Sequence, residues 1–289
     1  TVSVEGVNFH VNGEITYKSA KNSNVQGLLI NSRMINAIFD NTKTEYNYLF
    51  TYPDTGKWDP QRNTNEYVGN LTKYKEAGML GFTVGLQGGN PFGYGFNEPS
   101  NISGQPWINS AYNEDTGALV PAFFDRLTQV MKEADDLGMI PIIQLFYAAQ
   151  VNRMNDKTQQ TALNNTLDWL MKSGYENFVI EVANECNYCN GIASEDQMPE
   201  TLKYVRSYTK GKYILGSSLG GGHTPSDSLI EAADMIMLHG NGQSPSGITS
   251  MINKVKESSA YKSKPKPIIF NEDDHYDFTD SSNNFKSAV

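Results

Sequence analysis

The sequence has no long hydrophobic run. Its apolar stretches stay short of the roughly 18 consecutive residues that a membrane-spanning helix needs, so we expect no membrane partner. The chain also lacks a basic segment followed by an apolar one at its start, which would mark a secretion signal. Either no such signal exists or it was removed. The first residue, Thr1 rather than Met, favours the trimmed form of a secreted, periplasmic or cell-surface protein.

Cysteine and histidine, which bind transition metals, are scarce, with 2 and 4 residues respectively. Cys186 and Cys189 form a C-x-x-C pair, but two ligands do not complete a zinc site and no histidine lies at the usual spacing. The pair could form a short disulfide or remain as two free thiols, and the sequence leaves both open. We expect no bound metal.

Glycine-rich nucleotide-binding motifs are missing as well. The glycines at Gly85–Gly89 and Gly220–Gly222 do not match the G-x-G-x-x-G dinucleotide motif. The second cluster also lacks the Lys-Ser/Thr pair of a phosphate-binding loop. We therefore expect no cofactor.

Positive charge is in deficit, with 23 Lys and Arg against 32 Asp and Glu and a formal net charge of -9. An acidic chain without a basic stripe repels phosphate backbones, which argues against a nucleic-acid partner. A hydrophobic content of 38% provides enough material for a core. We expect a single domain over residues 1–289, as a monomer or weak oligomer.

Residues 1–17 alternate apolar and polar side chains around Asn12-Gly13, which predicts a β-hairpin ahead of the main fold. After it, short apolar strands alternate with amphipathic helices. The predicted strands are 34–39, 79–86, 139–146, 178–183, 213–217, 235–239 and 267–270. The predicted helices are 63–78, 120–138, 158–174, 199–210, 226–233 and 248–258. Repeated βα units with nearly continuous apolar strands predict an α/β fold, specifically a (β/α)8 TIM barrel.

This pattern contains seven strands, and the eighth is missing. After Phe270 come a loop and a helix start at 283–289. An open barrel would expose two strand edges. Either the count is one too low or the barrel continues beyond this chain, and we expect the second, with a C-terminal end that is incomplete.

In such barrels the active site lies at the carboxyl ends of the strands. Glu185 ends the fourth predicted strand and Glu272 ends the seventh, so the two face each other across the barrel mouth. Hydrolysis of a glycosidic bond uses such a pair, and a retaining enzyme holds the carboxyls about 5–5.5 Å apart. We therefore predict that Glu185 and Glu272 are catalytic.

Residues 134–143 (ADDLGMIPII), 179–185 (VIEVANE) and 267–272 (PIIFNE) resemble the third, fourth and seventh βα units, respectively, of clan A glycoside hydrolases. These include cellulase-like and mannanase-like families. The resemblance implies a retaining β-glycosidase with Glu185 as acid/base and Glu272 as nucleophile. It also implies that Asn184 binds the sugar 2-hydroxyl and that His239 lies beside the reacting centre. Arg33 would steady the nucleophile's charge, and the partner would be a poly- or oligosaccharide.

Further candidate substrate-binding residues lie in the loops at the barrel mouth. Sugars stack on aromatic rings, and the loops 41–63 and 87–118 are long enough to suggest a function. The candidates are Tyr147, His223, His275, Trp58, Trp107, Tyr94 and Phe96. We expect Trp169 to belong to the core and Glu181 to point into the barrel and pair with a buried cation. Asp273 and Asp274 could be a solvated run or calcium ligands.

Three other functions compete with a glycosidase. A metal-dependent barrel hydrolase needs clustered histidines, and the four present form no His-x-His pair. A non-catalytic carbohydrate-binding relative would not need both glutamates. A structural scaffold would leave the long aromatic loops unexplained.

Overall fold

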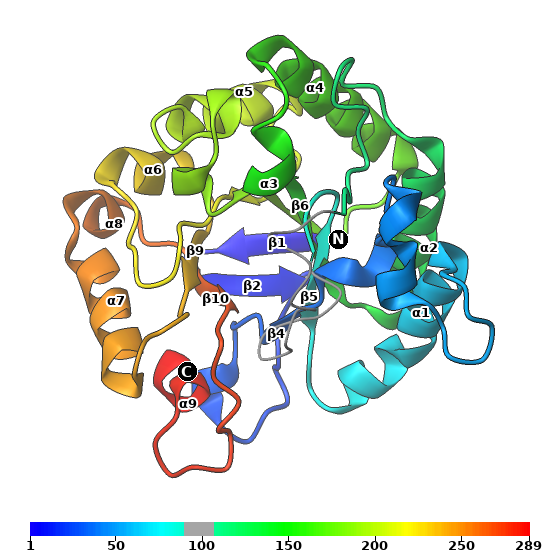
Figure 1. The fold of residues 1–289 in the computed structure, drawn as a ribbon. Coiled ribbons are helices and arrows are strands. Elements are labelled where there is room, and N and C mark those ends of the chain that lie inside the picture. The colour runs from blue at the N-terminus through cyan, green and yellow to red at the C-terminus, as the bar shows by residue number, and fades with distance from the viewer. Residues whose placement is uncertain (90–106) are drawn as a thin grey trace.

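The computed structural model of the protein describes residues 1–89 and 107–289. In these residues, parallel strands alternate with helices that surround them (Figure 1). The parallel strands are β4 (Asn31–Arg33), β5 (Gly81–Gly85), β6 (Ile140–Tyr147), β7 (Val179–Asn184), β8 (Leu215–Gly216), β9 (Ile236–His239) and β10 (Ile268–Glu272). The α-helices are α1 (Pro60–Glu76), α2 (Pro121–Leu137), α3 (Ala148–Val151), α4 (Asp156–Ser173), α5 (Met198–Tyr208), α6 (Asp227–Ala232), α7 (Pro245–Glu257), α8 (Ser259–Ser263) and α9 (Asn284–Ala288). The 3-10 turns are η1 (Ser23–Val25), η2 (Ile35–Ile38), η3 (Thr44–Phe50), η4 (Cys186–Tyr188) and η5 (Gly191–Ala193).

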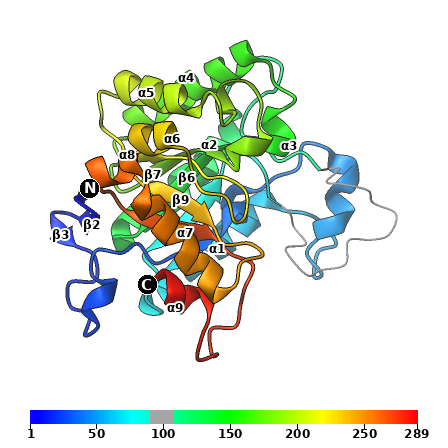
Figure 2. The ribbon, with the colours of Figure 1, turned by 90° about the vertical axis from the view of Figure 1, so that its left-hand side faces the viewer.

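The strands follow one another around the barrel in chain order. Strands β4 to β8 form one parallel sheet, and β9 pairs with β10 in another. Between the two sheets, the backbone N–H of Asp234 donates to the carbonyl of Leu215 (2.8 Å). The fold is a TIM barrel, as the strand–helix alternation predicts, and Figure 2 shows the helices that cover its side.

Strand β10 returns to the side of β4, but in the described residues no backbone ladder joins these two strands. A side chain crosses between them instead, because Asn31 Nδ2 donates to the carbonyl of Phe270 (3.1 Å). The described residues thus hold the seven parallel strands that the sequence predicts, and a loop and helix α9 follow β10. None of the helices described is both long and apolar enough to cross a membrane.

Local sequence signals explain where the elements begin and end. Strands β6 and β7 are buried almost throughout, as expected for parallel strands with both faces covered. Asn155 is the N-cap of helix α4, and its side chain accepts the N–H of Thr158. Helices α2 and α4 both end at a glycine with positive φ, Gly138 (64°) and Gly174 (80°).

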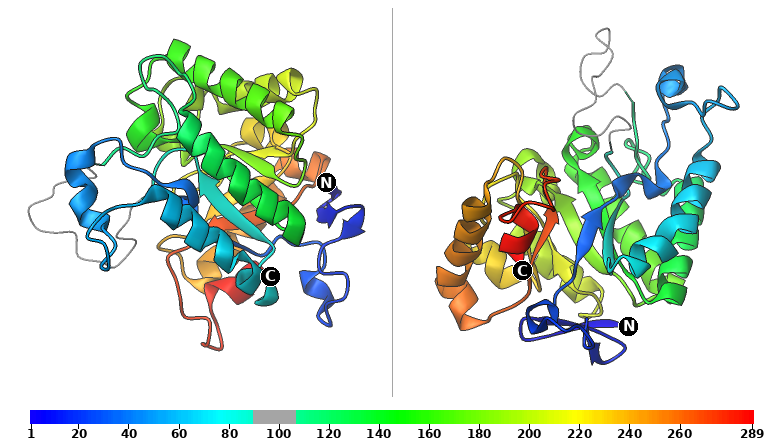
Figure 3. Two further views of the ribbon diagram at one scale, coloured as in Figure 1. Left: turned by 90° about the vertical axis from the view of Figure 1, so that its right-hand side faces the viewer. Right: turned by 90° about the horizontal axis from the view of Figure 1, so that it is seen from below.

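The N-terminal residues form a small sheet that closes one end of the barrel (Figure 3, right). It has three strands, β1 (Val2–Glu5), β2 (Asn8–Val11) and β3 (Glu14–Ile15), one more than the predicted hairpin. The predicted turn is present, with φ of 51° at Asn12 and 82° at Gly13. Phe9 is 1% exposed and packs against the apolar barrel interior.

The first barrel strand lies earlier than the sequence predicts. Residues 34–39 are apolar and were expected to form it, but the strand is β4 and residues 35–38 form the 3-10 turn η2. Side chains of α1 bind the carbonyls of this segment: Asn63 Nδ2 donates to Asn36 (2.8 Å) and Thr64 Oγ1 to Ala37 (2.8 Å). The segment is apolar because it is buried between α1, α2 and the barrel.

Candidate active site

The interior of the barrel changes from apolar to polar toward the carboxyl ends of its strands. Side chains on one strand alternate between the inside and the outside, so every second residue faces the interior. The apolar layer near Phe9 is formed by Leu29, Ile140, Ile142, Val179, Met237 and Ile269. The polar layer at the other end is formed by Arg33, Gln144, Glu181, His239 and Asn271.

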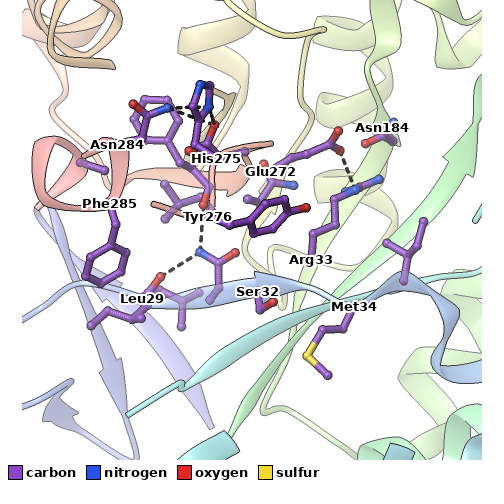
Figure 4. Close-up of a pocket in the computed structure, with 18 of the residues that line it drawn as sticks. Leu29, Ser32, Arg33, Met34, Asn184, Glu272, His275, Tyr276, Asn284 and Phe285 are labelled. Carbon is purple, nitrogen blue, oxygen red and sulfur yellow. Dashed lines mark hydrogen bonds and ion pairs between the residues drawn. The ribbon is translucent and has the colours of Figure 1, made fainter. Parts of the chain in front are cut away.

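Glu272 lies at the carboxyl end of β10, in a strand with a bulge between Phe270 and Glu272. A bulge redirects the side chains that follow it. The Oε2 atom of Glu272 lies 2.6 Å from Arg33 Nε, and Figure 4 shows the two side chains pointing toward one another. Its Oε1 atom accepts from Asn241 Nδ2 (2.6 Å). Donors therefore meet both oxygens, which is the pattern of an ionised carboxylate.

Glu185 follows β7 directly and has an uncommon backbone conformation. Its φ of 46° and ψ of 57° lie in the left-handed region, which costs a non-glycine residue roughly 1–2 kcal/mol. Such strain persists where the surroundings fix it, often at a functional site. The side chain is 22% exposed, and its Oε1 atom lies 3.0 Å from His239 Nδ1.

His239 lies between the two carboxylates. Its side chain is fully buried, and its Nδ1 atom is also 3.5 Å from Glu272 Oε2. One carboxylate oxygen of each glutamate and one ring nitrogen of the histidine all lie within 4.8 Å of one another. Residues from three different strands therefore converge on one point at the barrel mouth.

Several buried polar atoms beside this point have no hydrogen-bond partner of their own among the described residues. Asn184 Oδ1 and His239 Nε2 are two of them, and both residues are at most 2% exposed. Buried polar atoms are nearly always paired in native proteins, and Asn184 lines both of the spaces described below, so its Oδ1 atom is available to a bound molecule.

A cavity of about 670 Å³ runs from the carboxylates along the gap between β4 and β10. Tyr147, Asn184, Glu185, Arg33 and Glu272 line its polar end. Toward the other end it is lined by Leu28, Leu29, Ile268, Phe270, Phe285 and Val289.

A smaller hollow of about 380 Å³ lies on the other side of Glu185. Its walls include Tyr147 and Tyr188, and the side chain of Tyr188 is exposed. Glu185 therefore borders both spaces. Tyr188 lies between the two cysteines of the C-x-x-C pair, and no pattern in the sequence identified it as a site residue.

Two other histidines predicted for the site lie in different surroundings. His275 lines the large cavity, and its Nδ1 atom lies 3.0 Å from Asp273 and 2.9 Å from Asp274. The hydrogen bond with Asp273 raises the pKa of His275. His223 is exposed, its Nδ1 atom contacts the carbonyl of Gly220 (3.0 Å), and it lines neither space.

The predicted tryptophan platforms are not at this site. Trp107 is completely buried and donates from Nε1 to the carbonyl of Gly89 (2.9 Å), so its ring is closed to a sugar. Trp58 stacks on Tyr52 and donates to Asp40 Oδ1 (3.1 Å). Neither ring lines either space, because both pack within their own loops.

Three further aromatic residues were singled out from the sequence. Tyr94 and Phe96 lie outside the described residues. Trp169 packs at the edge of the core, with its ring 5.0 Å from that of Phe124.

Cys186 and Cys189 are free thiols, which decides between the two alternatives left open by the sequence. Burial raises the pKa of each thiol to about 12. Both are therefore protonated at neutral pH and are poor nucleophiles.

Three residues that sequence analysis did not select position the candidate catalytic groups. Asn241 binds Glu272, Gln144 Oε1 accepts from Arg33 Nη2 (2.8 Å), and Ser218 Oγ accepts from the backbone N–H of Glu185 (3.0 Å). Asn241 and Ser218 lie just after the ends of β9 and β8, which is the signal that narrows the search for them, whereas Gln144 lies inside β6.

No protein-family model matches this sequence, and no curated protein matches it either. Solved structures do match in fold. A family 5 glycoside hydrolase from Bacteroides vulgatus has a TM-score of 0.55 at 12% identity, covering 96% of this chain and 54% of its own. A family 5 mannosidase from Rhizomucor miehei has a TM-score of 0.52 at 12% identity, covering 94% of this chain and 72% of its own.

A further structure from Bacteroides vulgatus, a candidate glycoside hydrolase, has a TM-score of 0.55 at 14% identity and is covered over 46% of its length. This chain thus spans about half the length of the two Bacteroides proteins that it matches. The likeness establishes that the chain has the TIM-barrel fold of glycoside hydrolases of family 5.

Proposed function

We propose that this protein is a retaining glycoside hydrolase that cleaves β-glycosidic bonds in a poly- or oligosaccharide. The observation that carries the proposal is the approach of Glu185 and Glu272, which have oxygens within 4.8 Å of each other. Retaining enzymes hold their two carboxyls about 5–5.5 Å apart, whereas inverting enzymes need about 6.5–9.5 Å to admit a water. The 4.8 Å limit joins one oxygen of each glutamate rather than the two carboxyl centres, and so close an approach favours a double displacement.

The contacts of the two glutamates suggest different roles. Glu272 accepts from Arg33 and Asn241, which keeps it ionised and holds it in place as the nucleophile. It would attack the anomeric carbon and form a covalent glycosyl-enzyme. Glu185 borders the open hollow and would give a proton to the leaving oxygen. It would then take a proton from the water that releases the sugar.

One unpaired buried atom fits a hydroxyl-rich ligand. Asn184 Oδ1 would bind a hydroxyl of the sugar whose bond is cleaved. The leaving group must lie on the side of Glu185, where Tyr147 and Tyr188 can stack on the apolar face of a sugar ring. Because one structural neighbour is a family 5 mannosidase, β-mannosides are among the first substrates to test.

The stereochemistry of the product tests this proposal. Substrates should be screened first among plant, algal and host polysaccharides and their aryl β-glycosides. Proton NMR of the fresh product should then show the β-anomer before it mutarotates, because two displacements restore the original configuration. First appearance of the α-anomer would rule out the retaining mechanism. Tight glycan binding without any turnover would support a non-catalytic relative instead.

A metal-dependent hydrolase is the second candidate, because Glu185, His239 and Glu272 could together hold a metal ion. The Arg33 guanidinium disfavours it, since its Nε atom lies 2.6 Å from the Glu272 oxygen that also faces His239. A divalent cation there would be repelled by the positive charge beside it.

Metal removal separates these two functions. We expect full glycosidase activity after exhaustive dialysis against a chelator, because Arg33 already supplies the positive charge beside Glu272. Activity before and after dialysis should be measured together with the metal content of the protein. A loss of activity that added Zn²⁺ restores would favour the metal-dependent enzyme.

A further inference from the structure

Glu181 is a third carboxylate in the polar layer, directly beneath the two glutamates of the site. It lies on β7, four residues before Glu185, and it is completely buried. Removing a charge from water is costly unless several partners compensate. A buried glutamate in a barrel interior therefore calls for a physical explanation.

The partners of Glu181 connect it to the backbone of Glu185. Its Oε1 atom accepts a hydrogen bond from Ser218 Oγ (2.6 Å). The same Ser218 Oγ accepts the backbone N–H of Glu185 (3.0 Å). Because the single hydroxyl proton of Ser218 is given to Glu181, its oxygen is free to accept from Glu185. The carboxylate thus fixes the direction in which the serine can act.

Ser218 accepts hydrogen bonds from the backbone on both sides of the Glu185 Cα atom. Its carbonyl also accepts the N–H of Cys186, the residue after Glu185 (2.9 Å). Two consecutive N–H groups therefore point at one residue, on either side of a left-handed φ of 46°. These bonds compensate for the strain and direct the Glu185 side chain toward His239.

The other oxygen of Glu181 faces the strand of the second catalytic glutamate. Its Oε2 atom accepts from Asn271 Nδ2 (3.3 Å), and it lies 3.9 Å from Arg33 Nη1. Asn271 precedes Glu272, and Arg33 is the cation bound to Glu272. One buried side chain therefore contacts groups that hold both candidate catalytic residues.

The hydrogen bonds of Glu181 indicate its charge. Burial raises the pKa of Glu181 above its ordinary value, and Arg33, His239 and the bonds from Ser218 and Asn271 offset part of that rise. Arg33 and Asn271 present donors to Oε2, and the Ser218 hydroxyl can donate to Oε1, which is a set of partners that suits an ionised carboxylate. The pattern favours the carboxylate.

We propose that Glu181 is a positioning residue that acts through the Ser218 hydroxyl to hold the backbone of Glu185 in its left-handed conformation. This proposal rests on the function proposed above, because it assigns Glu181 and Ser218 to the orientation of the acid/base. It assigns Glu181 no contact with the substrate.

The leaving-group dependence of Ser218→Ala tests the proposal. We expect kcat/KM to fall on the order of 10²-fold for a phenyl glycoside, whose leaving oxygen needs a proton. It should fall much less for a dinitrophenyl glycoside, which leaves without one. Ser217→Ala is the matched control, since its hydroxyl donates to Ala183 and not to Glu181. Rates should be referred to the concentration of folded protein, and an equal fall of kcat/KM for both substrates in folded Ser218→Ala would overturn the proposal.

A double-mutant cycle examines the connection between the two residues. Glu181→Gln should also impair the phenyl substrate selectively. If Glu181 acts through Ser218, the double variant Glu181→Gln/Ser218→Ala should lose less than the product of the two single losses. Strict multiplication of the two losses would show that the residues act independently and would contradict the relay.

A crystal structure of Ser218→Ala gives an answer that does not depend on activity. We expect residue 185 to leave the left-handed region and its carboxylate to move out of hydrogen-bond reach of His239. An unchanged φ and an intact contact would overturn the proposal, even in an active enzyme. If the wild-type protein cleaves no glycoside, the proposed function fails, and this structure still decides whether Ser218 holds the backbone.

Discussion

Glu272→Ala is expected to lower kcat on the order of 10⁵-fold, while the protein stays folded and binds its substrate. The variant lacks the atom that would attack the anomeric carbon, and loss of a nucleophile has effects of about this size in other hydrolases. Arg33 and Asn241 lose their acceptor at the same time. Steady-state kinetics with a dinitrophenyl β-glycoside would measure the loss.

Added azide should restore part of this activity. The small anion fits the space left by the carboxylate and attacks from the same side, in a single displacement. Its product should therefore be the α-glycosyl azide, which NMR identifies. Asp273→Asn is the matched control, because Asp273 is the next residue and binds His275 rather than the reacting centre. Loss of less than about tenfold would count against Glu272 as the nucleophile.

Glu185→Ala is expected to lower kcat/KM by a factor that depends on the leaving group of the substrate. General acid catalysis contributes typically 10²–10⁴-fold, so kcat/KM for a phenyl glycoside or an oligosaccharide should fall by about that factor. A dinitrophenyl glycoside should still form the glycosyl-enzyme quickly. Water then reacts slowly without its base, so a burst of dinitrophenol should precede a slow steady state in stopped-flow absorbance.

Azide distinguishes this variant from the first one. Here it attacks the covalent intermediate from the face that Glu185 borders, and the product should be the β-glycosyl azide. Opposite configurations from two variants of one protein would assign both roles at once. Glu195→Gln provides a control on the loop that follows Glu185. An equal loss for phenyl and dinitrophenyl substrates would remove Glu185 from the role of the acid.

The order and type of the main barrel elements could be predicted from the sequence because each has a local pattern. Apolar runs indicated the strands β5 to β10, and helical spacing indicated α1, α2, α4, α5, α6 and α7, whereas the short elements α3, α8, β3 and the 3-10 turns were not predicted. The predicted position of the first barrel strand was wrong because tertiary packing, not strand formation, makes this segment apolar. Residues 34–39 are apolar because α1, α2 and the barrel bury them, and the side chains of Asn63 and Thr64 take carbonyls that a strand would have paired.

The two candidate catalytic glutamates could be located because each directly follows an apolar strand. Their supports could not, because those contacts depend on how different strands lie against each other. Asn241 reaches Glu272 across 31 positions and Ser218 reaches Glu185 across 33. The bulge in β10, which shifts the register between Phe270 and Glu272, leaves no mark in the local pattern. Trp107 was predicted to contact substrate but is completely buried, because the aromatic content of a loop does not reveal which rings are exposed.

The ion pair between Arg33 and Glu272 also bears on the stability of the barrel. It joins β4 to β10, two strands that no backbone ladder connects in the described residues, with the Asn31 side chain as a second tie. Proteins open locally where few backbone bonds hold them, at a lower free energy than global unfolding. Within the part of the chain that the structure describes, the junction of the barrel with the fewest backbone bonds therefore passes through Glu272, the candidate nucleophile. A ligand held there bridges this junction, so occupancy of the site and cohesion of the barrel are thermodynamically linked.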